Sequence, residues 1–435
     1  MKILLLTSEE WNDYTYSNGV LTNWFTGFDA EFAQIYTSPG MPNNNICHHY
    51  FRITDGEMAR SIFTRKKVGQ VIHMAETADA LEATKTNAKR EGTYGVMKKI
   101  SLWFHTPVVL LRDFIWLNGK YNIEGLRKFI NDFNPDIIFS PRYASPKMMR
   151  LENVVHQLTN VPMVAFTADD EASLRQYSLS PLFWMRRLWI HRMFGRHVKG
   201  LYKQYWTFSE DQAKEYARQY DLITSTLYKC GDFPETYVEK EVGKPIRLVY
   251  AGRLYCNRWK TLAEIGKALQ KINTNGERVV LDIYTTERVT KAQNDALCPA
   301  QYVYLHGAVE PSALTNIYRK ADIALHVESL DRKYRLATRV SLSTKIIDLM
   351  ASSCAIMAIC WNQHAGYQYL KSNDAAFCID DYSQILPVLQ SIVENPKLIA
   401  EYARKAHDCG RKNHNREKIQ EQIRLKFSEI IECEG

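Results

Sequence analysis

Short apolar runs alternate along the chain with longer stretches in which apolar residues recur at helical spacing. In the first half, the runs of strand length are Lys2–Thr7, Phe32–Thr37, Asp136–Ser140, Met163–Thr167, Tyr205–Ser209 and Thr226–Cys230. Helices are expected between them, for example at Asn122–Phe133 and Lys147–Leu158. This alternation is typical of parallel sheets covered by helices, so it predicts an α/β fold.

A second series of the same kind follows residues 233–245, a polar segment with two prolines that is typical of a linker. Its expected strands are Arg247–Ala251, Val279–Tyr284, Val303–Leu305, Asp322–Val327, Cys354–Ile359 and Ala376–Ile379. Its expected helices are Thr261–Ile272, Pro311–Arg319 and Thr344–Ala351. Two such series predict two doubly wound, Rossmann-like domains, 1–238 and 245–412, with a ligand-binding cleft at the carboxyl ends of the strands.

The last stretch of the chain, 416–431, is rich in Glu, Lys, Gln and Arg and is expected to be helical. Its apolar residues Ile419, Ile423, Phe427 and Ile431 recur every four positions. Such a stripe lies on one side of a helix and needs a partner surface.

Composition narrows the function classes. The 56 Lys and Arg against 48 Asp and Glu give a net charge of +8, which suits an anionic ligand or membrane surface, and there is no concentrated basic stripe for nucleic acid.

Nine cysteines without a CxxC pair predict buried, reduced thiols, and Cys47-His48-His49 is expected in a loop. The first apolar run is too short for a signal peptide, and the run Trp103–Leu117 is broken by Arg112 and Asp113. A cytoplasmic protein without a metal site is therefore expected.

The twenty glycines contain no GxG, and no GxxxxGK[ST] motif occurs. A dinucleotide fingerprint and a P-loop both need glycines at those spacings, so NAD or FAD enzymes and P-loop ATPases are disfavoured.

Cations follow the first strand of the second series. Arg253, Arg258 and Lys260 lie between the end of this strand and the next helix, where they can neutralise a diphosphate without a metal. The alternative is a solvated basic turn.

A second candidate anion site is Ser343-Thr344-Lys345, which opens the expected helix 344–351. The alternative is a plain N-cap. Asp348 is expected one turn later on the same side, where a carboxylate can take a ribose diol. Glu328 is the other acid expected at these strand ends.

These residues carry a family resemblance. The runs LVYAGRLYCNRWKTLAEI, YVYLHGAVEPSALTNIYRKADIALHVES and STKIIDLMASSCAIMAI resemble the donor-binding half of GT-B glycosyltransferases, closest to the retaining group known as family 4. The match covers roughly 115 residues (246–360) in the family's order. The first half resembles the family in outline, with Asn18-Gly19-Val20 opening a helix, and the strands NPDIIFS and VPMVAFTADD later.

The resemblance implies a nucleotide-sugar site. It places Arg253, with either Arg258 or Lys260, on the donor diphosphate, and Gly19 of the first domain against the same group. It places His306 and Gly307 near the nucleoside. The family's two glutamates seven residues apart are replaced here by Glu328, a longer segment 329–342 and Asp348. It also implies that the last helix, 413–435, packs back on the first domain.

The acceptor is expected on the first domain. Asp169 and Asp170 follow an expected strand and are candidate acceptor contacts or bases, the alternative being a solvated loop pair, and no DxD metal motif occurs. The stretch 183–206 has Trp184, Leu188 and Trp189 at helical period with cations between them. This pattern suits a helix on an anionic bilayer surface, or else a helix packed on the sheet. A second aromatic and basic stretch, 98–120, favours the membrane surface slightly.

The sequence and this resemblance together predict a metal-independent GT-B glycosyltransferase, and the resemblance alone implies that it retains the anomeric configuration. It would move a sugar from a nucleotide diphosphate sugar to a glycan or lipid-linked acceptor, as in bacterial-type surface polysaccharide synthesis, at the inner face of the membrane. Two alternatives stay open. One is a nucleotide-sugar epimerase of the same fold, and the other is a catalytically weak chain that serves as the partner of an active transferase.

Overall fold

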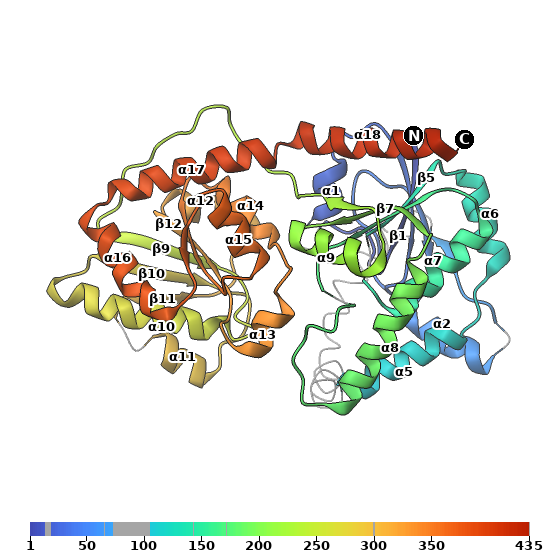
Figure 1. Cartoon of the computed structure of the whole chain (residues 1–435), viewed down its shortest axis with the longest axis horizontal. Coiled ribbons are helices and arrows are strands. Elements are labelled where there is room, and N and C mark those ends of the chain that lie inside the picture. Colours follow the sequence, from blue (N-terminus) through green and yellow to red (C-terminus); the bar gives the residue numbers. More distant parts are fainter. Residues whose placement is uncertain are drawn as a thin grey trace. The chain divides into compact units, whose positions relative to one another are not determined.

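A computed structural model of the chain describes residues 1–13, 19–64, 66–72, 105–141, 143–170, 172–298 and 301–434. The chain forms two compact units (Figure 1). Unit 1 comprises Met1–Leu174, Ser178–Leu227 and Gln420–Gly435, and unit 2 comprises Arg175–Tyr177 and Tyr228–Ile419. Each unit has its own sheet and its own hydrophobic core.

Unit 1 is built on an eight-stranded sheet of order β4-β3-β2-β1-β5-β6-β7-β8. Its strands are β1 (Lys2–Thr7), β2 (Glu31–Tyr36), β3 (His49–Arg52), β4 (Gln70–Ile72), β5 (Ile137–Pro141), β6 (Met163–Thr167), β7 (Tyr202–Thr207) and β8 (Thr224–Thr226). All neighbours pair in parallel except β3 and β4. The central strand β1 (KILLLT) is buried from Ile3 onward, as expected for a parallel strand covered on both faces.

Helices pack on this sheet through apolar stripes. They are α1 (Val20–Phe25), α2 (Asp55–Phe63), α5 (His105–Asn118), α6 (Ile123–Phe133), α7 (Pro146–Leu158), α8 (Pro181–His197) and α9 (Glu210–Tyr220). In α6, Leu126, Phe129, Ile130 and Phe133 are buried at helical spacing, and Asn122 caps the first turn by accepting from Gly125 N–H.

The last helix, α18 (Arg416–Glu434), returns to unit 1. Ile423 and Phe427 are fully buried, and the Phe427 ring lies 5.8 Å from Phe139 and 5.5 Å from Trp206. The buried stripe continues to Ile430, whereas the expected Ile431 is only half-buried. An interval of four exceeds the 3.6 residues of a helical turn, so the fourth residue of the expected stripe drifts off the buried face.

Unit 2 has a six-stranded parallel sheet of order β11-β10-β9-β12-β13-β14. Its strands are β9 (Ile246–Ala251), β10 (Val279–Tyr284), β11 (Val303–His306), β12 (Ile323–Val327), β13 (Ala355–Ile359) and β14 (Phe377–Ile379). Numbered from β9, the spatial order is 3-2-1-4-5-6, the doubly wound order of dinucleotide folds. The order reverses between β9 and β12, and a ligand is expected at that point, outside the carboxyl ends of the two strands.

Helices cover both faces of this sheet (Figure 1). They are α10 (Arg258–Ile272), α11 (Lys291–Leu297), α12 (Pro311–Arg319), α13 (Arg332–Ala337), α14 (Thr344–Met350), α15 (Ala365–Ser372), α16 (Ile385–Glu394) and α17 (Lys397–Asn413). Two single 3-10 turns occur at Asn273–Asn275 and Tyr382–Gln384. Leu262, Ile265 and Leu269 of α10 join one core cluster with Leu248 of β9 and Ile323 of β12. The first turn of α10 is thereby fixed beside the end of β12.

The α/β prediction is confirmed, and most expected strands end within a few residues of the observed ones. The strand expected at Thr226–Cys230 is wrong, because β7 pairs with Thr224–Thr226 and the chain then leaves the sheet. His49, expected in a loop, begins β3 and pairs with Ala33. Among the described helices, none is long and apolar enough to cross a membrane.

Candidate functional site

The turn after β9 carries the predicted cations at the point where the strand order reverses. It runs from Gly252 to Asn257, and Cys256 and Asn257 take left-handed φ values of 57° and 59°. These two residues redirect the chain into α10, so that Arg258 is the first residue of the helix and its side chain turns toward β12.

Arg258 forms a two-point ion pair with Glu328, the residue that follows β12. Its Nη2 donates to Oε1 at 2.6 Å and its Nε to Oε2 at 3.0 Å, and its guanidinium lies over the Tyr255 ring. Both side chains are largely buried. Burial opposes the charge of Arg258, but the charge and hydrogen bonds of Glu328 outweigh it and raise the arginine pKa. The pair holds a permanent cation at the end of the sheet.

Lys345 reaches the same place from α14. Its Nζ donates to the carbonyl of Ala251, the last residue of β9, at 3.1 Å. Burial lowers the pKa of Lys345, and the nearby cations Arg258 and Arg253 lower it further. A side chain at Gly252 would lie 2.6 Å from this Nζ, so the turn needs glycine here for the lysine to approach.

Arg253 completes this group. It is exposed, and no acidic side chain among the described residues pairs with its guanidinium. The turn around it is fixed by Tyr250, whose hydroxyl donates to the Arg253 carbonyl at 2.6 Å, and by Glu287, which accepts from Leu254 N–H at 2.8 Å. Arg253, Arg258 and Lys345 thus place three cations at one edge. Together with the Glu328 carboxylate the group has a net positive charge, which attracts a multivalent anion.

Lys260 points elsewhere. Its Nζ pairs with Asp331 at 3.0 Å in an exposed contact, and Asn257 donates to the same carboxylate at 2.6 Å. The hydrogen bonds from Asn257 and Lys260 lower the pKa of Asp331. Of the two cations that the sequence left open, the geometry places Arg258 beside Lys345 and Lys260 beside Asp331.

The second predicted anion site lies at the start of α14, and Asp348 lies within the same helix. Ser343 is the N-cap residue, but its side chain makes no capping bond, and Thr344 and Lys345 open the helix. Asp348, one turn later, is half exposed and accepts from Lys229 at 2.7 Å. Lys229 lies outside the predicted motifs and was not foreseen.

His306 and Gly307 lie at the end of β11. The His306 ring stacks on Tyr284 with centroids 4.4 Å apart and planes 12° from parallel, and its Nε2 bonds Asp282 at 2.7 Å. Nothing lies within 4 Å of the position a side chain at Gly307 would take, so packing does not require glycine there. The stacked, half-exposed pair offers a flat surface of the kind on which aromatic bases pack.

No protein-family model and no curated protein matches this sequence. The structure is similar to sucrose-phosphate synthase from Thermosynechococcus elongatus, at 12% identity and a TM-score of 0.62, with 100% of both chains covered. It is similar to HepE from Anabaena in complex with UDP, at 12% identity and a TM-score of 0.59, covering 99% of this chain and 100% of that one. It also resembles a chain of the GtfA/B complex at 14% identity and a TM-score of 0.52, covering 72% of this chain but only 61% of that chain.

The chain has the GT-B fold. Unit 1 and unit 2 are its two Rossmann-like domains, and the predicted resemblance is confirmed at the level of fold.

Within this fold, unit 1 supplies three residues that the sequence singled out. Gly19 precedes α1 at a φ of 46°, a left-handed conformation that favours glycine; Asn18 lies outside the described residues. Asp170 is buried and bonds Ser173 and Arg187, the latter at 3.2 Å. Asp169 is exposed, and its carbonyl accepts from Gln212 at 2.9 Å. The Asp170 contacts hold the loop after β6, while Asp169 stays at its surface.

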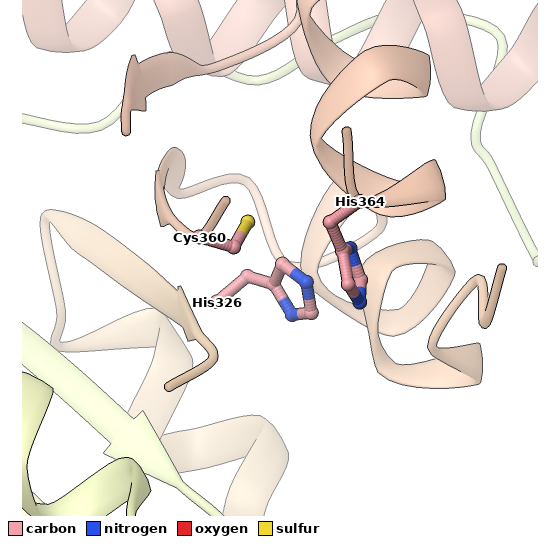
Figure 2. A group of neighbouring side chains, drawn as sticks. All are labelled: His326, Cys360 and His364. Carbon is pink, nitrogen blue, oxygen red and sulfur yellow. The ribbon is translucent and has the colours of Figure 1, made fainter. Parts of the chain in front are cut away.

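A group of three buried titratable side chains lies near the cations Arg258 and Lys345 of unit 2. His326 of β12, Cys360 after β13 and His364 before α15 are buried and approach one another (Figure 2). Burial lowers the pKa of both imidazoles, with His364 and Arg258 adding to the effect on His326. Burial also raises the pKa of the Cys360 thiol. All three groups are therefore uncharged near neutral pH.

Sequence reasoning missed this group, because its members sit in apolar segments without a ligand-spacing motif. It also missed Asp331, Asp282 and Tyr284. Asp282 and Tyr284 have His306 as a partner because β10 and β11 are neighbours, and Asp331 meets Asn257 and Lys260 because β9 and β12 are neighbours. The position of Asp331 after a strand end was a usable signal, as it was for Glu328.

Proposed function

We propose that the chain is a glycosyltransferase that takes a sugar from a nucleotide diphosphate sugar. The observation that carries the proposal is the convergence of Arg253, Arg258 and Lys345 at the reversal of strand order in unit 2. Diphosphates of nucleotides bind at this position in doubly wound folds. UDP is bound to the HepE structure of the same fold, and UDP-glucose to a second HepE structure, which supports this class of donor.

The residues have distinct roles in this proposal. Arg253, Arg258 and Lys345, with the Ser343–Thr344 helix start, hold the diphosphate and stabilise the negative charge that develops on it as the sugar departs. Their charges make a metal unnecessary for that step. Glu328 holds the Arg258 guanidinium in place through both of its carboxylate oxygens, and it lies beside the departing diphosphate. Asp348 takes the ribose diol, and His306 with Gly307 lies beside the base.

The finer points are part of the same proposal. Transfer proceeds with retention, and the acceptor is a glycan or a lipid-linked hydroxyl of surface polysaccharide synthesis. It binds to unit 1, with Asp169 as a contact. The position of Asp170 beneath the loop suits it to positioning Asp169 rather than to acting as a base.

The proposal is tested by thermal stabilisation and calorimetry with a panel of nucleoside diphosphates and their sugars. Wild-type protein should be stabilised by at least one member. Arg253→Ala should weaken that binding by roughly tenfold to a hundredfold, the range for a lost charged contact. Arg253 has few structural contacts, so the variant should stay folded. Arg319→Ala, an exposed arginine at the end of α12, is the matched control. Equal binding by wild type and Arg253→Ala would refute the assigned site.

Turnover separates the alternatives. A transferase consumes the bound donor when acceptor extracts are added and labels a glycan or lipid. An epimerase produces an isomeric nucleotide sugar without acceptor. A chain that serves only as a partner binds the donor and does neither.

Contact with an anionic membrane is the second part of the proposal, and α5 and α8 support it. Arg186 of α8 pairs with Asp113 of α5 at 2.7 Å, which ties the two helices together. Leu111 and Phe114 of α5 are 60% and 57% exposed, and Met185 of α8 is 56% exposed. Exposed apolar side chains on paired helices are typical of an interfacial surface.

Charge favours a lipid surface over another protein as the partner. Between Ser178 and Ser209 there are six Lys or Arg and no Asp or Glu. The sequence predicted Trp184, Leu188 and Trp189 on the apolar face of α8 and its cations on the other face. The structure differs in detail, because Arg187 turns inward to Asp170 and Ser173. Trp184 is half-buried and donates to the Ser178 carbonyl at 2.8 Å. The exposed apolar residues are instead Leu182, Met185 and Leu188.

Vesicle sedimentation tests this surface. Wild-type protein should sediment with vesicles that contain phosphatidylglycerol at low salt, and less at high salt, because salt screens the attraction. Met185→Glu/Leu188→Glu should abolish sedimentation. Ile223→Glu, at an exposed apolar residue of unit 1 outside α5 and α8, should leave it intact. Sedimentation of the double variant at the wild-type level would contradict the proposal.

A further inference from the structure

Three side chains with metal-binding chemistry meet inside unit 2. Each of His326, Cys360 and His364 offers one ligand atom, and these atoms lie within 4.8 Å of one another. Their exposed fractions are 5%, 0% and 2%. They come from the end of β12, the residue after β13 and the residue before α15, and Figure 2 shows the three side chains as close neighbours.

Two nitrogen atoms of this group are unsatisfied. The Nε2 atoms of His326 and of His364 are buried and have no hydrogen-bond partner. Buried polar atoms nearly always have one, and each exception needs a physical explanation. The two rings lie 5.9 Å apart at 47°, so they do not satisfy one another by stacking or by a direct hydrogen bond.

We propose that His326, Cys360 and His364 bind one transition-metal ion, and that Zn²⁺ is the ion this donor set suits best. Imidazole nitrogen and thiolate sulfur are ligands for zinc and similar metals, whereas Mg²⁺ and Ca²⁺ take oxygen ligands. Three protein ligands leave a fourth position for water.

The geometry requires a small closure. Ligands at zinc bond lengths of about 2.0 to 2.3 Å in a tetrahedron stand roughly 3.3 to 3.6 Å apart. The three atoms must therefore approach by about one ångström, which side-chain rotation supplies. Cys360 releases its thiol proton to solvent on binding, so the site gains a net charge of +1 from Zn²⁺.

His364 changes partner when the ion binds. Gly366 N–H donates to its Nδ1 at 3.1 Å, which places the ring proton on Nε2 in the metal-free protein. Coordination through either nitrogen ends that hydrogen bond, because the metal takes Nδ1 itself or the proton moves there. The ion thus replaces the hydrogen bond between Gly366 and His364 at the start of α15 with metal–ligand bonds that connect β12, β13 and α15. This link fixes the strand end that carries Glu328 without touching the diphosphate cations.

Metal binding by the full chain tests the proposal, independently of any transferase activity. Protein freed of metal with a chelator should bind one equivalent of Zn²⁺ and melt at a higher temperature. Co²⁺ should give a thiolate-to-metal absorption band. Cys360→Ala should lose this band and the tight equivalent, whereas Cys298→Ala, which removes a half-buried thiol outside the group, should keep both.

X-ray absorption of the wild-type zinc complex provides a test without substitutions, should Cys360→Ala fail to fold. One sulfur and two imidazole ligands support the proposal. A sulfur-free ligand set, more than one weak equivalent, or an unchanged Co²⁺ spectrum in Cys360→Ala would overturn it. Because every readout is made without nucleotide, failure of the metal site and failure of the donor site are separate results.

Discussion

The two units share a parallel sheet in which the strand order reverses beside the first strand, but they place opposite charges at the end of that strand. In unit 2 the strand β9 is followed by Gly252 and Arg253, with Arg258 and Lys345 beside them. In unit 1 the strand β1 is followed by Ser8, Glu9 and Glu10. The parallel sheet provides a binding edge in both units, but the turn that follows the strand decides which ligand charge is accepted.

A buried cation also has a different environment in each unit. Arg258 donates to both carboxylate oxygens of Glu328, and its pKa is raised. Lys147, at the start of α7 in unit 1, lies 3.8 Å from Asp55 and 5.2 Å from the centre of the Trp116 ring. Burial lowers the pKa of Lys147, and Asp55 offsets this only in part. A two-point partner stabilises a buried charge, whereas a distant one leaves a net cost.

Arg258→Leu should have the largest effect, because it leaves Glu328 buried without its partner. Removal of one member of a buried pair costs about 3–5 kcal/mol of unfolding free energy, and diphosphate binding should be lost as well. Hydrogen exchange in β9 and β12 under increasing urea measures the loss within unit 2 alone. Arg258→Leu/Glu328→Leu should recover most of the stability but not the binding. Equal stability of the single and double variants would show that the pair does not hold this edge.

Lys345→Ala should lower diphosphate affinity by roughly tenfold to a hundredfold and have little effect on stability. Burial, Arg258 and Arg253 depress the pKa of Lys345 below its usual 10.5, and only the protonated form attracts the anion. Wild-type affinity should therefore fall as pH rises through that lowered pKa. Calorimetry across this pH range should show a flatter profile for Lys345→Ala. A parallel decline in both proteins would place the titrating group elsewhere.

Lys147→Met should change stability in the opposite direction to Arg258→Leu. Methionine fills the space without a buried charge, and Asp55 keeps its hydrogen bond from Trp116 at 2.5 Å. We expect a gain of about 1 kcal/mol at neutral pH. The folded-state pKa of Lys147 lies below the unfolded value near 10.5, so wild-type stability should rise between those two values. Urea unfolding of unit 1 should show this rise in the wild type only; a loss of stability in Lys147→Met would mean that Asp55 and Trp116 stabilise the charge in full.

The two edges also show what a sequence can predict. Long buried runs such as KILLLT and VVLDIY predicted β1 and β10 residue for residue, because strands covered on both faces are continuously apolar. The short strands β3 and β4 were not foreseen, since pairing with β2 rather than local pattern makes them strands. Arg253 and Arg258 were predictable from their position after β9, but the direction in which each cation points depends on the left-handed residues Cys256 and Asn257.

Lys260→Ala should have the smallest effect, and it tests that dependence directly. Lys260 lies two residues after Arg258, yet it pairs with Asp331 at the surface, where both side chains are more than 40% exposed. Exposed pairs contribute about 0–1 kcal/mol, and Asn257 still donates to Asp331 after the substitution. Unfolding free energy and diphosphate affinity should therefore stay close to those of the wild type, with a change in affinity of less than about threefold. Should Lys260→Ala weaken binding as much as Lys345→Ala, the anion site would extend along α10 toward Asp331. The difference between the cationic turn after β9 and the acidic turn after β1 would then depend on the total charge of each turn. The direction in which the start of α10 points each cation would not matter.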